Sequence, residues 1–436
     1  MAWWPWLLVQ LVVWCCAGLV AVLWWKWATR PQIDAPGPPT LPIIGNILNF
    51  LEMPVTLHKM FDLHHQYGNL VRLYVGPMLL VMVAHPDDVQ HILLTSKLVD
   101  RGAIVTNLLR PFAGVGLINI DASRWKLHRK LINPTFHSQL LEGFLEAFHD
   151  GGLFVSERLA RTRGAATDVH PPVFLAAIHN FCSTIMGMNH DLIPDATRAE
   201  ELSAAVSDGL ITVQKMILRP WMQNKFLLRL TSKGRGVLKF VKILENWAMH
   251  CIAKRSAATE DAPTKTRQRL LEALVKPGGQ TAIPLDEVQG EETLRLFPMV
   301  PILPRVATEE VWLSGGSPGS VLVPKGALLF VMPLLTHRLP QFFPDPQRFD
   351  PSRFLEDRVR KEHVCSYLPF GLGARNCVGS QYGRLQLKVY LADILRRFRF
   401  LPCSRLEDLE NCALSLSLNP IKPIRVSCMP LGGPST

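Results

Sequence analysis

The residues best suited to carry chemistry lie near the C-terminus, where positions 370–379 read FGLGARNCVG. Cys377 stands between Gly373 and Gly379, with Arg375 two residues before it and an apolar pattern of helical period after it. A thiolate there lies at a helix N-terminus, where free N–H groups and the helix dipole stabilise negative charge. The glycines let the backbone approach a flat, bulky group, and Arg375 can reach an anion. This combination indicates haem iron held by an axial cysteine. A buried structural cysteine in a tight turn is the alternative.

The same stretch matches FxxGxRxCxG, the haem-binding loop of the cytochrome P-450 family, at every specified position. This resemblance implies that Cys377 is the catalytic thiolate and the iron ligand of haem b. It further implies that Phe370, Gly373, Arg375 and Gly379 surround the cofactor. The fold that the resemblance implies is mostly α-helical with a small β part, behind one N-terminal transmembrane helix.

A second group of candidate residues lies in RWKLHRK at positions 124–130. Trp125 and Arg129 stand four residues apart on one face of a predicted helix, and both can donate hydrogen bonds to one carboxylate. An amphipathic surface helix is the alternative, and the pair taken alone favours that alternative. In the family a WxxxR pair binds one haem propionate, and Arg305 matches a strand arginine that binds the other.

A third group contains Glu292 and Arg295, three residues apart on a predicted helix, followed by Arg353 in FDPSRF. By itself such a helix pair contributes little to stability. Two arginines around one carboxylate are compatible with burial only if every donor is matched. The resemblance implies that these three residues form a buried structural network beneath the haem-bearing loop.

The elements that must position these residues follow from the periodicity of apolar side chains. Two strand-like runs at 69–75 and 78–84 flank Gly76–Pro77, which predicts a hairpin. Helical periodicity is predicted at 87–94 and over most of 140–253, a charged exposed loop at 255–284, and a small sheet at 300–331.

The N-terminal residues 2–25 carry no charge and are long enough to cross a bilayer as a helix, with tryptophans at both ends. A secretory signal peptide would need a charged start and a shorter apolar core. Lys26 and Arg30 follow the span, so the positive-inside rule places the body in the cytosol. The proline-rich stretch 31–42 is interpreted as a semi-rigid spacer. The predicted domains are a transmembrane anchor at 2–25, a proline-rich hinge at 26–45 and a catalytic domain at 46–428.

Composition restricts the partners. The 436 residues are 48% hydrophobic, which allows a large core, and the formal net charge is +11. That charge favours a phospholipid surface, an acidic redox protein or nucleic acid. The basic residues form no zinc-finger spacing or long run, so we expect no nucleic-acid partner. Nine cysteines without a CxxC pair disfavour a disulfide framework and a zinc site.

The resemblance extends from the hinge to about Pro423. Sequence segments such as HRKLINPTFH and ETLRLFP look like those of family 4, the fatty-acid ω-hydroxylases. It implies a monooxygenase that hydroxylates a lipophilic substrate, such as a fatty acid, with O₂. Its electrons would come from NADPH through NADPH-cytochrome P-450 reductase, with cytochrome b5 as a further candidate donor. The implied location is the endoplasmic reticulum membrane, single-pass, with the catalytic domain in the cytosol.

One family motif is not met. Members carry (A/G)GxDT or (A/G)GxET on a central helix, whose acid and threonine guide protons to bound oxygen. Here LDEVQG at 285–290 runs directly into the helix of Glu292, and the GxET string at 290–293 shares that glutamate with the ExxR pair. We interpret the match as coincidence and expect an internal truncation near 288–291. The alternatives to an active enzyme are therefore a catalytically impaired or dead haem-binding splice form, and an incomplete gene model. An unrelated membrane receptor is disfavoured because the motifs occur in family order.

Overall fold

The protein is described by a computed structural model. The described residues are 4–50, 57–96, 98–113, 116–136, 141–185, 285–355, 363–414 and 417–431, with short pieces at 229–231, 234–236, 238–239, 241–243, 245–246 and 249. The predicted loop at 255–284 and much of the predicted helical stretch beyond residue 185 lie outside the described residues.

The described part of the chain is built mainly from helices. The longer ones are α1 (Trp4–Ala28), α2 (Leu57–Tyr67), α4 (Ala103–Ala113), α5 (Ala122–Ile132), α7 (Leu145–Ala160), α8 (His170–Thr184), α13 (Leu285–Leu296) and α16 (Ser380–Leu395). Short helices are α3 (Pro86–Gln90), α14 (Pro333–Thr336) and α17 (Leu406–Glu410), with single turns at η1 (Ile47–Phe50), η2 (His91–Thr95), η3 (Asn133–Phe136) and η6 (Pro351–Phe354).

The strands form small sheets. They are β1 (Leu70–Val75), β2 (Met78–Val83), β3 (Thr167–Asp168), β4 (Leu303–Val306), β5 (Val311–Leu313), β6 (Val321–Val323), β7 (Leu328–Val331), β8 (Phe398–Pro402), β9 (Cys412–Leu414), β10 (Leu418–Pro420) and β11 (Arg425–Pro430). The largest sheet has the order β1-β2-β7-β4, in which only the β2–β7 pair is parallel. A second sheet has the order β3-β11-β8, and β5–β6 and β9–β10 are antiparallel pairs.

The predicted hairpin is present, because β1 and β2 pair antiparallel from Leu70 opposite Val83 to Val75 opposite Met78. Gly76 adopts a φ of +61° in the turn, a conformation that glycine reaches without steric cost. The strands predicted within 300–331 are also found, as β4 to β7, but they do not form one sheet: β4 and β7 join the sheet of the hairpin, and β5 and β6 form a separate pair. The fold class predicted from the sequence, mostly helical with a small β part, is thus confirmed.

The proline-rich stretch 31–42 differs from the predicted spacer, since it lies along the free edge of β1. The Arg72 N–H donates to the carbonyl of Pro36 at 2.8 Å. Asn46 and the backbone of Tyr74 exchange two hydrogen bonds, of 2.7 and 2.8 Å. Prolines suit such an edge because they have no N–H to leave unpaired. The stretch is therefore part of the folded body.

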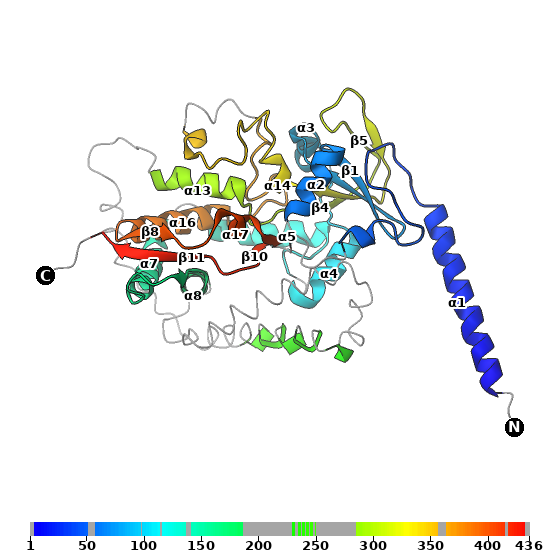
Figure 1. Cartoon of the computed structure of the whole chain (residues 1–436), viewed down its shortest axis with the longest axis horizontal. Helices are drawn as coiled ribbons and strands as arrows, with labels where there is room; N and C mark the ends of the chain where they lie inside the picture. The colour runs from blue at the N-terminus through cyan, green and yellow to red at the C-terminus, as the bar shows by residue number, and fades with distance from the viewer. Residues whose placement is uncertain are drawn as a thin grey trace.

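Helix α1 projects from the body (Figure 1). It runs to Ala28, three residues beyond the predicted span, and its segment Trp6–Ala28 has a mean hydropathy of 2.4 with none of the helix buried. At about 1.5 Å per residue the helix exceeds the roughly 30 Å hydrocarbon layer of a bilayer. By length and composition it is able to span a membrane.

Two apolar cores lie on either side of the cysteine-bearing segment. One packs against the main sheet and includes Leu93 and Leu368. The other joins α7, α8 and α16 and includes Phe148, Tyr382 and Tyr390. Residues 368–382 run from the first core to the second, so the segment that carries Cys377 connects the two cores.

Candidate functional site

The loop before α16 adopts backbone conformations that glycine reaches more readily than other residues. Gly371 and Gly373 have φ values of +71° and +73°, which favour glycine. A Cβ at Gly373 would lie 2.1 Å from the carbonyl oxygen of Leu93, so no other residue fits there without movement. The Cys377 N–H donates to the carbonyl of Phe370 at 2.9 Å, and the Cys377 side chain is exposed. The loop therefore presents this thiol outward, two residues before the helix cap.

The other predicted loop residues have different surroundings. Phe370 packs beneath the guanidinium of Arg384, whose central carbon is 5.0 Å from the ring centroid. A Cβ at Gly379 would meet Phe136 at 3.6 Å, an ordinary contact, and Gly379 has a negative φ of −93° as the cap of α16. Close approach explains the glycine at 373 and does not explain the one at 379.

Three arginines converge beside this loop: Arg101, Arg305 on β4, and Arg375. No salt bridge to a carboxylate is found for any of them within the described residues. Arg305 is 4% exposed, and its Nη1 donates only to the carbonyl of Pro304. The Nε of Arg101 is buried without a hydrogen-bond partner. Positive charge is thus concentrated here without a salt bridge among the described residues, although the charges of Asp100 and Asp121 act in the opposite direction to burial on the pKa of Arg375.

Burial and the repulsion between like charges lower the pKa values in this cluster. Burial, and then the charges of Arg101 and Arg375, lower the pKa of Arg305 to about 9. Burial, and then the charge of Arg101, lower the pKa of Arg375 to about 10. Burial also lowers the pKa of Arg101. An anion placed among the three would relieve both the repulsion and the desolvation.

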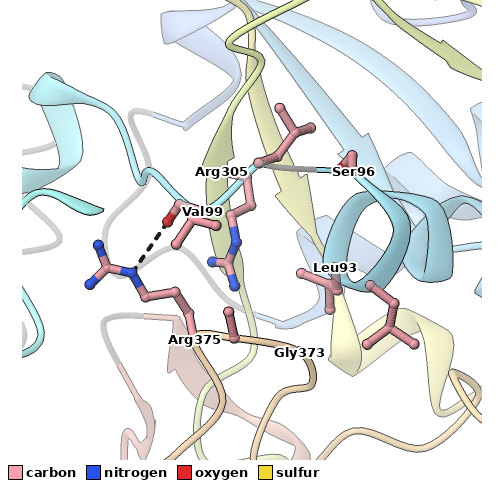
Figure 2. Close-up of a pocket in the computed structure, with 9 residues that line it drawn as sticks. Leu93, Ser96, Val99, Arg305, Gly373 and Arg375 are labelled. Atoms are coloured by element: carbon pink, nitrogen blue, oxygen red, sulfur yellow. Dashed lines mark hydrogen bonds between the residues drawn. The ribbon is translucent and has the colours of Figure 1, made fainter. Parts of the chain in front are cut away.

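A small cavity of about 120 Å³ opens at this cluster (Figure 2). Arg305 on the sheet and Arg375 on the cysteine loop line it together with Leu93, Ser96 and Val99, and the Arg375 side chain extends toward Val99. The Arg375 Nε donates to the carbonyl of Val99 at 3.3 Å. Pockets for whole ligands measure roughly 300–1,000 Å³. This cavity therefore has the size of a carboxylate group and not of a complete cofactor.

The Trp125–Arg129 pair reaches the loop in a way the spacing does not predict. The guanidinium of Arg129 forks onto Asn376, with Nη1 on its backbone carbonyl and Nη2 on its side-chain oxygen, both at 2.8 Å. Its Nε donates to Asn133 at 2.7 Å. The ring of Trp125 is buried under Arg375, 4.6 Å from the guanidinium carbon. Arg129 thus has three of its five N–H groups engaged, and the two residues are not aimed at one acceptor.

The ion-pair network lies fully inside the protein. Glu292 and Arg295 on α13 are both 0% exposed and form a bidentate pair at 2.7 and 2.8 Å. The Glu292 carboxylate also accepts from the Asp350 N–H at 2.9 Å. Arg353 approaches it at 3.6 Å, an ion-pair distance without a hydrogen bond. The structure therefore brings together the three residues that the sequence singles out, with Arg353 as the weakest contact.

His337 connects this network to the cysteine loop. Its Nε2 accepts from the Leu368 N–H at 2.8 Å, so its Nδ1 carries the proton and donates to the carbonyl of Arg295 at 3.2 Å. Burial, with smaller contributions from the charges of Arg338 and Arg295, lowers the pKa of His337 to about 3. The imidazole is therefore neutral at physiological pH, as both hydrogen bonds require.

Sequence reasoning overlooked Arg101 and the role of His337. Arg101 stands alone in DRGA, with no spacing that relates it to Arg305 or Arg375. His337 is noticeable only as part of an HR pair before FPDP. Their partners lie far away along the chain, so neither leaves a local pattern.

The described residues fit a haem in charge and chemistry. The exposed Cys377 thiol is a suitable axial ligand. The arginines, which form no salt bridge within the described residues, suit an anionic edge with two carboxylates, and the cavity has room for one such group. The enclosed volume accounts for that edge and not for the whole macrocycle.

Comparison with known proteins gives a consistent result. The family model described as cytochrome P-450 matches residues 35–288 and 280–428. Probable cytochrome P-450 4s3 of Drosophila melanogaster is 25% identical over 433 residues, covering 83% of this chain and 86% of the relative. Cytochrome P-450 4c3 of the same species is 24% identical over 487 residues, covering 91% and 89%. Cytochrome P-450 4V2 of Rattus norvegicus is 25% identical over 408 residues, covering 76% of each. The resemblance to family 4 is thereby supported.

Glu292→Gln is expected to lower the free energy of unfolding by about 3–5 kcal/mol, because it leaves the buried Arg295 charge without a counter-charge. Arg124→Gln is the matched control, since Arg124 forms an i,i+3 pair with Asp121 in which the side chains are 69% and 55% exposed, and it should cost about 1 kcal/mol or less. Urea denaturation of both variants measures the difference. Equal losses of unfolding free energy would show that the buried pair contributes no more to stability than the control pair.

Acid should destabilise the fold through His337. Its pKa is about 3 when folded and 6.5 as an ordinary histidine, so below pH 6.5 the unfolded chain binds a proton that the folded chain does not. The free energy of unfolding should therefore fall by about 2 kcal/mol between pH 7 and pH 5 from this residue alone. His337→Gln should lack that share of the decline, measured by urea denaturation at both pH values. Parallel declines in the two proteins would contradict the assignment.

Proposed function

This chain belongs to the cytochrome P-450 family of haem-containing monooxygenases, and we propose that it hydroxylates a lipophilic substrate such as a fatty acid, with Cys377 as the axial ligand of its haem. The observation that carries the assignment of the site is the cluster of Arg101, Arg305 and Arg375 beside the loop of Cys377. Buried like charges without counter-ions are unfavourable unless an anion binds among them.

Each side chain then has a defined task. Cys377 ligates the iron, and Gly373 allows its loop to pass close to Leu93. Arg101, Arg305 and Arg375 bind the carboxylates of the haem edge. When bound, the haem supplies oxygen activation and the transfer of one oxygen atom into a C–H bond, while the protein orients and shields the reactants.

Trp125 and Arg129 take part less directly. Trp125 supports Arg375 from beneath its guanidinium, and Arg129 fixes Asn376, the residue before the thiol. Two N–H groups of Arg129 remain for a propionate. Glu292, Arg295 and Arg353 have a structural role beneath the loop.

The electron source and location follow from the family and from the charge. A net charge of +11 suits an acidic redox partner, and we assign that role to NADPH-cytochrome P-450 reductase, with cytochrome b5 as an additional donor. The apolar helix α1, followed by Lys26 and Arg30, supports attachment to the endoplasmic reticulum membrane with the body in the cytosol.

A second candidate function is that of an impaired haem-binding form that lacks the central helix. The alignment with cytochrome P-450 4c3 spans 487 positions, more than the 436 residues of this chain, so the relative contains residues with no counterpart here. The two segments of the family match meet at residues 280–288, next to the proposed junction at 288–291. Leu387 and Leu395, on one face of α16, are 42% and 39% exposed, as expected of a helix with a missing packing partner.

Cys377→Ser is expected to abolish the thiolate-type Soret shift of the reduced carbon-monoxide complex, because a hydroxyl does not replace the thiolate on iron. Difference spectra of the detergent-solubilised full chain measure it. Cys403→Ser, at another exposed cysteine, is the control and should leave the shift intact. Loss of the shift in both variants, or in neither, would contradict the assignment.

The full chain should remain in the membrane pellet during alkaline carbonate extraction of microsomes, because about 20 apolar residues suffice for stable insertion. A variant without residues 2–28 serves as the control and should be released. Release of the full chain into the supernatant would show that α1 is not a stable anchor.

Turnover of the 436-residue chain should be poorly coupled, with little hydroxylated product per NADPH consumed, because no motif supplies the proton-guiding acid and threonine. Such proton transfer contributes about a hundredfold or more in rate. The assay combines reductase, a medium-chain fatty acid, and two versions of the chain. One is unchanged, and the other carries a family central helix between Gly290 and Glu291. A polar helix of equal length at the same place controls for insertion itself. Equal coupling in all three would refute the prediction.

A further inference from the structure

His337 occupies a position between two backbone groups that belong to separate parts of the fold. On one side its Nδ1–H donates to the carbonyl of Arg295, at the end of α13. On the other side its Nε2 accepts from the N–H of Leu368, at the start of the cysteine loop. Its own carbonyl accepts from Arg295 Nη1 at 2.8 Å. The residue is 0% exposed, so no water replaces these bonds.

The N–H that His337 holds is the first link of a short series leading to the thiol. The carbonyl of Leu368 accepts from the Gly371 N–H at 3.1 Å, and the carbonyl of Phe370 accepts from the Cys377 N–H at 2.9 Å. A displacement of Leu368 is therefore transmitted to the backbone of Cys377 through two loop-closing hydrogen bonds. At its other end the loop is held by Arg129 on Asn376.

We propose that His337 is a positioning residue for Cys377, because it fixes the start of the thiolate loop to the buried Glu292–Arg295 pair. The inference rests on the proposed role of Cys377 as the haem ligand. It adds a residue outside the loop whose hydrogen bonds determine how the thiol is presented.

The chemistry of imidazole explains why this residue suits the task. A neutral imidazole has a donor and an acceptor fixed on one rigid ring, so it can join a carbonyl to an N–H across a buried gap. The ring packs against Tyr367, with centroids 5.2 Å apart, which restricts its rotation. An apolar residue here would leave both backbone groups buried and unpaired.

The experiment compares substitutions at His337 with one at its neighbour in the full chain. His337→Leu removes both hydrogen bonds, and His337→Gln retains a donor and an acceptor. Thr336→Val is the matched control, because Thr336 is also 0% exposed and its hydroxyl donates to the carbonyls of Ala84 and Met332, away from the cysteine loop. His337→Asn, too short to reach both backbone groups, replaces the leucine variant if that one does not fold.

The first measurement is amide hydrogen exchange of peptides covering residues 366–377, which needs no haem. His337→Leu or His337→Asn should speed exchange there about tenfold relative to Thr336→Val, the factor that corresponds to one lost hydrogen bond of about 1.4 kcal/mol. His337→Gln should restore most of the protection. Equal exchange in the leucine or asparagine variant and in Thr336→Val, or no rescue by glutamine, would overturn the proposal.

The second measurement is the carbon-monoxide difference spectrum at equal haem content. The leucine or asparagine variant should show a smaller fraction of the thiolate-type Soret band, and Thr336→Val an unchanged fraction. An unchanged fraction in the His337 variants would also overturn the proposal. If the chain takes up no haem, that result counts against the proposed function, and the exchange measurement alone decides the role of His337.

Discussion

The burial of one carboxylate constrains the arrangement of the whole site. Glu292 and its partner Arg295 are excluded from solvent, and such a pair is tolerated only when its remaining hydrogen-bonding groups are matched. The N–H of Asp350 and the carbonyl of His337 supply that matching. Two segments that follow α14 are thereby drawn to α13. The loop of Cys377 is attached to the same assembly through a backbone bond to the imidazole.

The arginine cluster has the opposite character, because none of its members forms a salt bridge with a carboxylate among the described residues. Besides burial, the charges of Arg101 and Arg375 lower the pKa of Arg305, and the charge of Arg101 lowers the pKa of Arg375. This arrangement costs stability in the absence of an anion, and an anionic ligand that binds the folded state alone would restore it. The fold thus combines an arginine paired with a carboxylate beneath the thiol with Arg305 and Arg375 beside it, whose guanidinium groups donate to backbone carbonyls. That difference favours a structural role for the first and supports the proposed anion binding by the second.

The parts of the fold and site that sequence could predict are those determined by near neighbours. The hairpin around Gly76 and the cysteine loop follow from residues that are near neighbours in the sequence. The bidentate contact of Arg129 with Asn376 joins residues 247 positions apart, and spacing carries no information about it. The same holds for Arg101, whose neighbours Arg305 and Arg375 are distant in the sequence, and for the docking of the proline-rich stretch on β1, where the hydrogen-bond partners are distant backbone groups.

Haem binding and oxygen chemistry depend on different parts of a chain of this family, and here the two parts are unequally represented. The groups proposed to hold an anionic, thiolate-ligated cofactor are present among the described residues and are mutually supported by hydrogen bonds. The acid and threonine of the (A/G)GxDT or (A/G)GxET motif have no counterpart that is free for that role, because Glu292 is already committed to Arg295. The leucine face of α16 at Leu387 and Leu395 is left in contact with solvent, although such a face gains stability from burial. On physical grounds, therefore, affinity for the cofactor and efficiency of turnover are separable properties of this chain, and the first can persist without the second.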